Sequence, residues 1–545
     1  MIARLVGSEM CIRDRIQALL GGGIIPNNPF TEKVFFDFDP VTEGDNSGIS
    51  LHYKKERDGS TLESITSVRN SFNENVQDVD FDGSPTVAPS PLSKDLEAVT
   101  QEFRLYSNNN EKVNWLVGAY YYQEDMVFNE SIYFGQTWRT YVDAFLPTGT
   151  ISGIAAAFGI PDSLLFASGQ GGTESATQDN TTTSIFGQLD IKLSEKLSAI
   201  IGVSYMEDEK TVSYSQINTD VLSNLDFIAA GFPPSQASFF RRLQLVPQFT
   251  NFPNAAQDGK STDDKVEYTF KLSYSVNEAI SVYGGISTGF KASAWNISRN
   301  SDADANELAG LIAAGTPPSP NRSVGRRYAG PEEAEVIELG AKIYLPSGYL
   351  NIAVFDQTID GFQSNTFIGT GFVLANAGSQ SADGYEFDLV YSPLENIDIT
   401  MSGTFLDPIY DSFPGSAFGD LTGTTPSNIP EDTIATSVTW NWDMNGWDGF
   451  TRLSHLYSSE AVLLENTEAQ AIIESQGNGI RKMDTLNFSA GIEKDNLSIS
   501  LYGQNINDDE YLTSAFVAVV DFTQTTYFGY PNNYATYGLN VNYKF

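Results

Sequence analysis

Apolar and polar residues alternate without exception at the C-terminal end of the chain. The apolar positions are Ala535, Tyr537, Leu539, Val541, Tyr543 and Phe545, and the residues between them are polar or small. Successive side chains of a β-strand point to opposite faces, so this period of two predicts a strand with one apolar and one polar face.

The same alternation recurs upstream. It is clear at residues 197–205, 270–276, 385–391, 397–405, 486–492 and 497–501. These runs approach the roughly 9 to 11 residues that a tilted strand needs to cross a bilayer. A membrane-spanning helix needs about 18 apolar residues in succession, and the nearest candidate, 145–167, is interrupted by Pro147, Pro161 and Asp162. The pattern therefore predicts an all-β protein and argues against a helical membrane protein.

Short and long connections alternate between the predicted strands. Short connections with turn-forming residues lie at 55–60, 107–112, 194–197, 277–279, 346–348, 393–396, 443–448 and 494–496. Long polar connections lie at about 129–180, 211–262, 292–332, 407–430, 460–481 and 508–533. Tight turns on one side and long loops on the other are typical of an outer-membrane β-barrel.

The eight short turns join sixteen strands, and the closing strand makes seventeen. Because every backbone N–H and C=O group in hydrocarbon must be paired, the sheet of such a protein has to close on itself. We therefore expect a transmembrane antiparallel β-barrel with long extracellular loops and short periplasmic turns. We also expect its last strand to pair with its first.

The charge and cysteine content narrow the possible functions. The chain has 31 Lys and Arg against 69 Asp and Glu, a formal net charge of −38. So acidic a chain repels nucleic-acid backbones, and we expect no nucleic-acid partner. The mean hydropathy of −0.22 is compatible with a barrel, whose lipid-facing and water-facing residues average out. The single cysteine, Cys11, excludes a disulfide framework and a CxxC site.

Several stretches resemble the C-terminal barrel of TonB-dependent outer-membrane receptors. They include TQEFRLYS (100–107), WLVGAYYYQED (115–125), SVYGGISTGFKASAWN (281–296), ANAGSQSADGYEFDLVYSP (375–393), LYGQNINDDEYL (501–512) and the closing YGLNVNYKF. Their shared order extends the resemblance from about Ser47 to Phe545. It implies a protein of the outer membrane of a Gram-negative bacterium. It also implies a wall of about 22 strands, of which about 17 would be present here.

The resemblance implies further parts that this sequence does not show. Members of the family carry a plug that fills the barrel and, before it, a segment that contacts the TonB complex. Residues 1–15, which contain VGSEMCIRDR, resemble translated sequencing adapter, and we expect them to be non-native. We expect residues 16–46 to be a remnant loop or linker and residues 47–545 to be a partial barrel domain.

The C-terminal strand carries a second implication of the resemblance. In outer-membrane proteins a terminal aromatic residue belongs to the signal that the barrel-assembly machinery reads. We therefore expect this machinery and the membrane lipid to be partners of the chain, and the TonB complex to be a partner only through the missing region. The positions of the expected assembly signal are Tyr537, Leu539, Val541, Tyr543 and Phe545.

Little in the sequence supports catalysis. The chain has two histidines, His52 and His455, which lie far apart in sequence. A Ser-His-Asp triad or a histidine metal site needs several such groups close together. We expect no enzymatic activity, no metal site and no cofactor.

Ligand capture is the chemistry that the long connections favour. Several combine aromatic rings with arginine, which could clamp the carboxylate or phosphate groups of an anionic small molecule. The alternative is that these residues form the interfacial girdle or pack the loops together. The candidate ligand-binding residues are Trp138, Arg139, Tyr141, Phe240, Arg241, Arg242, Trp295, Arg326, Arg327 and Tyr328.

The resemblance implies a receptor that actively takes up a scarce chelated nutrient, such as an iron–siderophore complex. Two alternatives stay open on the sequence. The first is a passive porin-type channel, and the second is a surface barrel that binds other cells or host proteins.

Overall fold

The computed structural model of the chain describes most of its residues. The described residues are 3–6, 20, 28–31, 33, 36–81, 83–108, 112–233, 236–237, 240, 243, 248–249, 251–254, 257–298, 322–323, 327–367, 372–475, 477–518 and 526–545.

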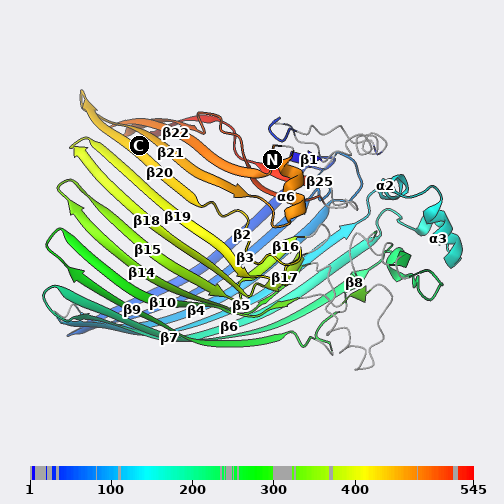
Figure 1. Cartoon of the computed structure of the whole chain (residues 1–545), viewed down its shortest axis with the longest axis horizontal. Coiled ribbons are helices and arrows are strands. Elements are labelled where there is room, and N and C mark those ends of the chain that lie inside the picture. Colours follow the sequence, from blue (N-terminus) through cyan, green and yellow to red (C-terminus); the bar gives the residue numbers. More distant parts are fainter. Residues whose placement is uncertain are drawn as a thin grey trace.

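Seventeen long antiparallel strands form the wall of a barrel (Figure 1). Each strand pairs with the next one along the chain, in sixteen consecutive ladders. The expected antiparallel barrel with seventeen strands is thereby confirmed. The wall strands are β2 (Val41–Arg57), β3 (Ser60–Gln77), β4 (Ser90–Ser107), β5 (Val113–Tyr133), β6 (Gly171–Lys192), β7 (Leu197–Asn218), β9 (Lys260–Ser275), β10 (Ile280–Lys291), β14 (Glu332–Leu345), β15 (Gly348–Asp360), β18 (Ser379–Leu394), β19 (Ile397–Ser412), β20 (Asp432–Met444), β21 (Trp447–Val462), β22 (Ile480–Lys494), β23 (Leu497–Gln504) and β26 (Thr536–Tyr543).

The short turns lie at one end of the barrel, and the described parts of the long connections lie at the other, on the right in Figure 1. The tightest turns place residues in the left-handed region, as Asn445 and Gly446 do between β20 and β21 with φ of 55° and 74°. Two successive residues with positive φ are typical of the type I′ turn, whose twist matches that of the flanking strands. The long connections at 78–89 and 361–378 were not predicted from the sequence. The connection at 361–378 contains the short strands at 363–367 and 372–376, whose sequences resemble those of wall strands.

The long connections contain the remaining elements. These are α2 (Trp138–Phe145), α3 (Thr150–Phe158), η1 (Asp162–Leu164), η2 (Leu222–Asn224), β8 (Gln248–Phe249), β11 (Ala294–Trp295), β12 (Arg322–Ser323), β13 (Tyr328–Ala329), β16 (Gln363–Phe367), β17 (Phe372–Asn376), α6 (Thr467–Glu474), β24 (Leu512–Val517) and β25 (Thr526–Pro531). The short strand β1 (Ala3–Val6) pairs with β25. Among the described helices, none has the length and apolar character needed to cross a membrane.

The outward face of the wall is an apolar belt. Phe270 on β9 lies opposite Ile201 on β7 and Ile286 on β10, and Leu339 on β14 lies opposite Val354 on β15. Many of these outward residues are exposed, for example Leu339 at 61%. A belt of exposed aliphatic and aromatic side chains around a strand wall is what lipid requires of a barrel.

Rows of carboxylates lie on the same outward face, nearer to the long connections. Asp383 on β18 lies opposite Asp356 on β15 and Asp407 on β19, and all three are exposed. Like charges directly opposite each other on neighbouring strands are destabilising, and the cost is smallest in water. These rows therefore indicate where the belt ends and the aqueous phase begins on the loop side of the barrel.

The two terminal strands of the wall each pair on one side. β2 pairs with β3 and β26 pairs with β23, and no register joins β26 to β2, both of which are fully described. Every residue of β2 is exposed, as is every residue of β26 except Gly538. The prediction that the last strand pairs with the first is therefore wrong for this structure, because no neighbouring strand covers the free side of either. β2 also begins at Val41, before the expected domain boundary at residue 47.

Candidate functional site

A hydrophobic cluster packs the connections that follow β3, β5 and β7 against one another. Trp138 on α2 is fully buried, and its ring stacks on Phe134 with the centroids 4.9 Å apart. Phe240 stacks on Phe227 at 4.8 Å, and Tyr141 is also buried. Three of the predicted ligand-binding residues thus lie in the core of the loops. Contact between them and a ligand stays a prediction.

Arg139 is held by two carboxylates of the same connection. Its Nε lies 2.8 Å from Asp143, one helical turn further on, and its Nη2 lies 3.1 Å from Asp162. The guanidinium group therefore links α2 to η1. The predicted residues Arg241 and Arg242 lie outside the described residues.

Arg327, in the connection between β10 and β14, is 1% exposed. Its guanidinium carbon lies 3.6 Å from the ring centroid of Tyr214 on β7 and 5.7 Å from that of Phe252. Its Nη1 donates to the backbone carbonyl oxygens of Asn296 and Ser298, both at 3.2 Å. This arrangement is a buried cation–π contact with additional hydrogen bonds. It fastens both ends of the β10–β14 connection to the end of β7.

The neighbours of Arg327 extend this contact toward solvent. The Trp295 ring stacks on Phe252 at 5.8 Å and meets the Tyr328 ring edge-on at 5.2 Å. Trp295 is half-buried and Tyr328 is 43% exposed, so Tyr328 presents the accessible surface of this group. The predicted residue Arg326 lies outside the described residues.

A polar hollow of about 810 Å³ lies against β21, β22 and β23. We call it the luminal pocket. It lies on the inward face, because Ser489 pairs with Arg452 and Tyr502, whereas the alternate residues Leu453 and Leu501 belong to the outward belt. Its lining residues are Arg452, Ser454, Thr485, Asn487, Phe488, Ser489, Tyr502, Gly503, Gln504, Asn505, Tyr511, Thr513, Tyr530, Pro531, Asn532 and Asn533.

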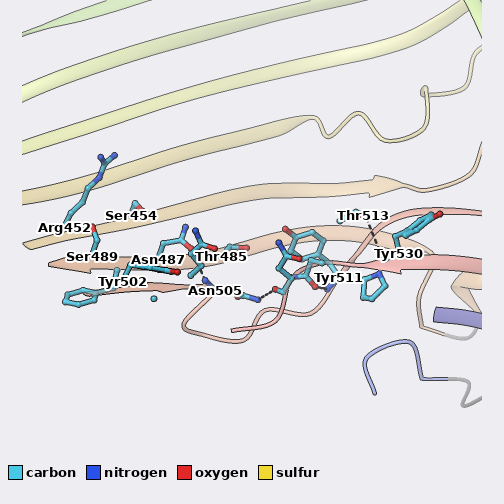
Figure 2. A pocket seen from close by; sticks show the side chains of 16 residues that line it. Arg452, Ser454, Thr485, Asn487, Ser489, Tyr502, Asn505, Tyr511, Thr513 and Tyr530 are labelled. Carbon is cyan, nitrogen blue, oxygen red and sulfur yellow. Dashed lines mark hydrogen bonds between the residues drawn. The ribbon is translucent and has the colours of Figure 1, made fainter. Parts of the chain in front are cut away.

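Figure 2 shows the two ends of the luminal pocket. Arg452, Ser489 and Tyr502 lie at one end, and Tyr511 and Tyr530 lie at the other. The pocket therefore runs from the strand wall toward the segment that connects β23 to β26.

Side-chain amides fix the shape of this connecting segment. Asn505 donates to the carbonyl oxygens of Asp509 and Asn533, both at 2.9 Å, and accepts from the Asp509 N–H at 2.8 Å. Asn532 donates to the Asp509 carbonyl at 2.7 Å and accepts from the Tyr511 N–H at 3.1 Å. Both asparagines are buried, so the end of the pocket near Tyr511 is built on satisfied hydrogen bonds.

A second hollow of about 260 Å³ lies among the long connections. We call it the loop pocket. Rings of Phe367, Phe418, Phe516 and Tyr527 line it together with Glu465. Its walls come from four connections that are far apart in sequence, so it exists only when these loops meet.

Neither pocket was predicted from the sequence. The sequence did contain a signal for the luminal pocket. Arg452 alternates with the outward-facing residues of its strand, and the stretch LYGQNINDDEYL contains Asn505, which fixes one end of the pocket. The loop pocket had no such signal, because its four segments carry no shared pattern.

Titratable groups gather at two further places. His455 Nε2 lies 2.5 Å from Asp484 in an exposed pair, and His52 lies on β2. Among the described residues, carboxylate oxygens of Asp37, Asp78 and Asp80 lie within 4.8 Å of one another. Each of these aspartates has other polar partners, and Asp80 accepts from the Val87 N–H at 2.7 Å. Neither group adds to the chemistry of the two pockets.

The barrel matches a known family over most of the chain. Residues 14–506 match the family model of the TonB-dependent receptor-like β-barrel. The chain belongs to the TonB-dependent receptors. These are outer-membrane proteins of Gram-negative bacteria that interact with TonB and bind small molecules, and the family is one of receptors and transporters.

Solved structures share this fold at low sequence identity. The ferric yersiniabactin uptake receptor FyuA from Yersinia pestis matches with a TM-score of 0.65 at 15% identity, over 93% of this chain and 62% of its own. The siderophore receptor PiuA from Acinetobacter baumannii matches with a TM-score of 0.62 at 15% identity, over 100% of this chain and 70% of its own. This TonB-dependent receptor chain thus spans 62% of the length of FyuA.

Proposed function

We propose that this chain is part of a receptor that actively takes up a scarce chelated nutrient, specifically an iron–siderophore complex. The observation that carries the proposal is the arrangement of the barrel: the described parts of the long connections lie at one end, and four of these connections form an aromatic pocket there. A rigid scaffold that presents loops is a common arrangement for binding. One of the similar solved structures is a siderophore receptor and another is a ferric yersiniabactin uptake receptor, which supports this choice of ligand.

In this proposal the complete receptor binds the iron complex at the loop pocket and passes it through the barrel. The energy comes from the TonB complex, acting on the plug of the complete receptor. The C-terminal segment that contains β26 serves in assembly, and its alternate residues from Tyr537 to Phe545 are exposed for recognition by the assembly machinery.

Uptake measurements in cells test the proposal. The complete receptor is expressed in a bacterium that lacks its own siderophore receptors, and radioactive iron is supplied with a panel of siderophores. We expect uptake with at least one siderophore, and we expect deletion of TonB to abolish it. Uptake that survives the deletion would support a passive channel, and cell adhesion without uptake would support a surface-binding barrel.

A matched pair of variants assigns the uptake to the loop pocket. Phe367→Ala removes an aromatic wall of the loop pocket, and Phe103→Ala removes a ring of the same size from the outward belt. We expect the first variant alone to raise the iron concentration needed for half-maximal uptake, by about tenfold for one lost aromatic contact. Equal effects of the two variants would contradict the assignment.

A further inference from the structure

Arg327 is buried although a charged group is costly to bury. Its side chain is 1% exposed, and its guanidinium group lies against the Tyr214 ring. A buried charge stabilises a fold only weakly, because the cost of removing it from water offsets much of its attraction to its partners. The planar guanidinium group does, however, fix the direction of the hydrogen bonds that it donates. Arg327 is therefore better suited to setting the position of a loop than to stabilising the whole fold.

The first residue that Arg327 positions is Asn296. Nη1 of Arg327 donates to the Asn296 carbonyl oxygen at 3.2 Å, and the Asn296 N–H donates to the Arg327 carbonyl oxygen at 2.7 Å. Asn296 is 5% exposed, and its side-chain oxygen accepts from the Ser298 N–H at 3.1 Å. The orientation of its amide is thereby fixed, and the Nδ2 atom donates to the carbonyl oxygen of Phe372 on β17 at 3.1 Å.

A second contact joins the same two connections. Asn376, at the other end of β17, accepts from the Gly330 N–H at 2.8 Å and donates to the Gly330 carbonyl oxygen at 3.0 Å. Gly330 directly follows β13, which pairs with β11. The β11–β13 pair and the residues next to it therefore hold β17 at both of its ends.

β17 in turn positions one wall of the loop pocket. It pairs with β16, where Phe367 lies opposite Phe372 with the ring centroids 5.2 Å apart. Phe367 lines the loop pocket together with Phe516, whose ring centroid lies 6.2 Å away. A continuous series of contacts thus leads from the buried guanidinium group to the aromatic wall of the pocket.

We propose that Arg327 is a positioning residue for the loop pocket. It fixes the β11–β13 pair, and this pair holds β17 in the place where the Phe367 ring completes the pocket wall. In this proposal Arg327 acts through its neighbours and not by touching the ligand. The inference rests on the proposed uptake function only for the role of the loop pocket in binding.

A distance measurement across the loop pocket tests the proposal without a ligand. In the 545-residue chain with Cys11→Ser, the exposed residues Asn365 on β16 and Glu468 on α6 are replaced by spin-labelled cysteines. Asn365 lines the pocket, and so does Ala469, the neighbour of Glu468. We expect double electron–electron resonance in detergent to give one narrow distance distribution. We expect Arg327→Met, an apolar replacement that leaves the fold intact, to give a broad distribution instead.

Two variants separate positioning from general damage to the loops. Arg327→Lys keeps a positive charge over the Tyr214 ring, so we expect it to restore most of the narrow distribution. Arg139→Met removes another paired arginine of the long connections, the one that links α2 to η1. We expect this matched control to leave the distance distribution unchanged.

The consequence for uptake is measured separately, in cells that express the complete receptor and receive radioactive iron with the same panel of siderophores. We expect Arg327→Met to raise the iron concentration needed for half-maximal uptake by about tenfold, as the loss of one aromatic contact would. The maximal rate should not change, because the variant alters the pocket and not the later steps. If the cells take up no iron, the uptake function fails, and the spin-label result still decides the positioning role.

Asn296→Ala interrupts the series of contacts one step later and serves as a second test. We expect it to broaden the distance distribution as Arg327→Met does, and we expect the double variant to broaden it no further, because both act through Phe372. The proposal is overturned if Arg327→Met keeps the narrow distribution, or if Arg139→Met broadens it equally. It is also overturned if Arg327→Met unfolds the chain while Asn296→Ala keeps the narrow distribution.

Discussion

At the scale of single residues, Asp220 is the carboxyl group most clearly altered by the folding of the loops. It is 2% exposed, accepts from the Leu222 N–H at 3.0 Å, and accepts from the Ser223 hydroxyl at 2.6 Å. Burial raises the pKa of Asp220 to about 6, against an ordinary value of 3.8, although the two hydrogen bonds oppose the rise. The buried form is therefore the protonated one at mildly acid pH.

The raised pKa predicts that the loop cluster around η2 is more stable in acid. A group with a raised folded-state pKa contributes stability that is complete below the unfolded value, near pH 4, and is lost as the pH rises through about 6. The change is at most about 3 kcal/mol. Hydrogen exchange of residues 219–232, corrected for intrinsic rates, should be slower at pH 4.5 than at pH 7.5. Asp220→Asn cannot ionise and should remove this difference; a difference that persists in the variant would contradict the assignment.

The same scale shows how far site residues can be predicted from sequence. The arginines of the long connections stand out by composition, but the sequence does not reveal which of them are covered. Arg327 is buried under Tyr214 and Phe252, which precede it by long stretches of chain. Arg452 lies on a wall strand, and nothing in the local sequence marks it as a site residue. Only the strand register shows that Arg452 and Tyr502 both pair with Ser489 on β22. The local sequence pattern shows which residue types are present and which face of a strand they lie on. Which residues lie close together is determined only by the assembled barrel.

At the scale of elements, each wall strand presents one face to lipid and one to water. On β7, Val203 is 54% exposed in the outward belt, and the next residue, Ser204, faces inward and donates to Glu267 at 3.2 Å. The same substitution should therefore be much more costly at Val203 than at Ser204.

We predict that Val203→Arg destabilises the barrel by about 2–4 kcal/mol in a lipid bilayer, the cost of a charge near the middle of the membrane. Ser204→Arg places the same group in the lumen near Glu267 and should change stability by less than about 1 kcal/mol. Urea unfolding of both variants in vesicles, followed by tryptophan fluorescence, measures the difference. Equal destabilisation by the two variants would mean that β7 does not have a lipid face.

Elements were predictable where alternation is long and uninterrupted. The wall strands and their short turns follow from the period of two and from turn chemistry at positions such as Asn445 and Gly446. The short strands β16 and β17 were not separated from the wall, because a five-residue alternating run has the same pattern in either place. Their position depends on contacts between loops.

At the scale of the whole molecule, the fold class followed from the order of short and long connections. The predicted pairing of the last strand with the first is not found in the structure. That prediction assumed that all strands of the barrel are present. In the structure the free sides of β2 and β26 are exposed. The acidic net charge is also a property of the whole, because exposed carboxylates at the loop side, such as Asp383, and inward carboxylates, such as Glu338, both contribute to it.

The central claim is that the strands form a membrane barrel with lipid outside and water inside. Spin labels placed one at a time at residues 266–274 of β9, after replacement of Cys11 by Ser, test it most directly in reconstituted vesicles. We predict that accessibility to oxygen peaks at the even positions, including Tyr268, Phe270 and Leu272, and that accessibility to a water-soluble nickel complex peaks at the odd positions. Accessibility that does not alternate along the strand, or that favours the nickel complex at every position, would contradict the account.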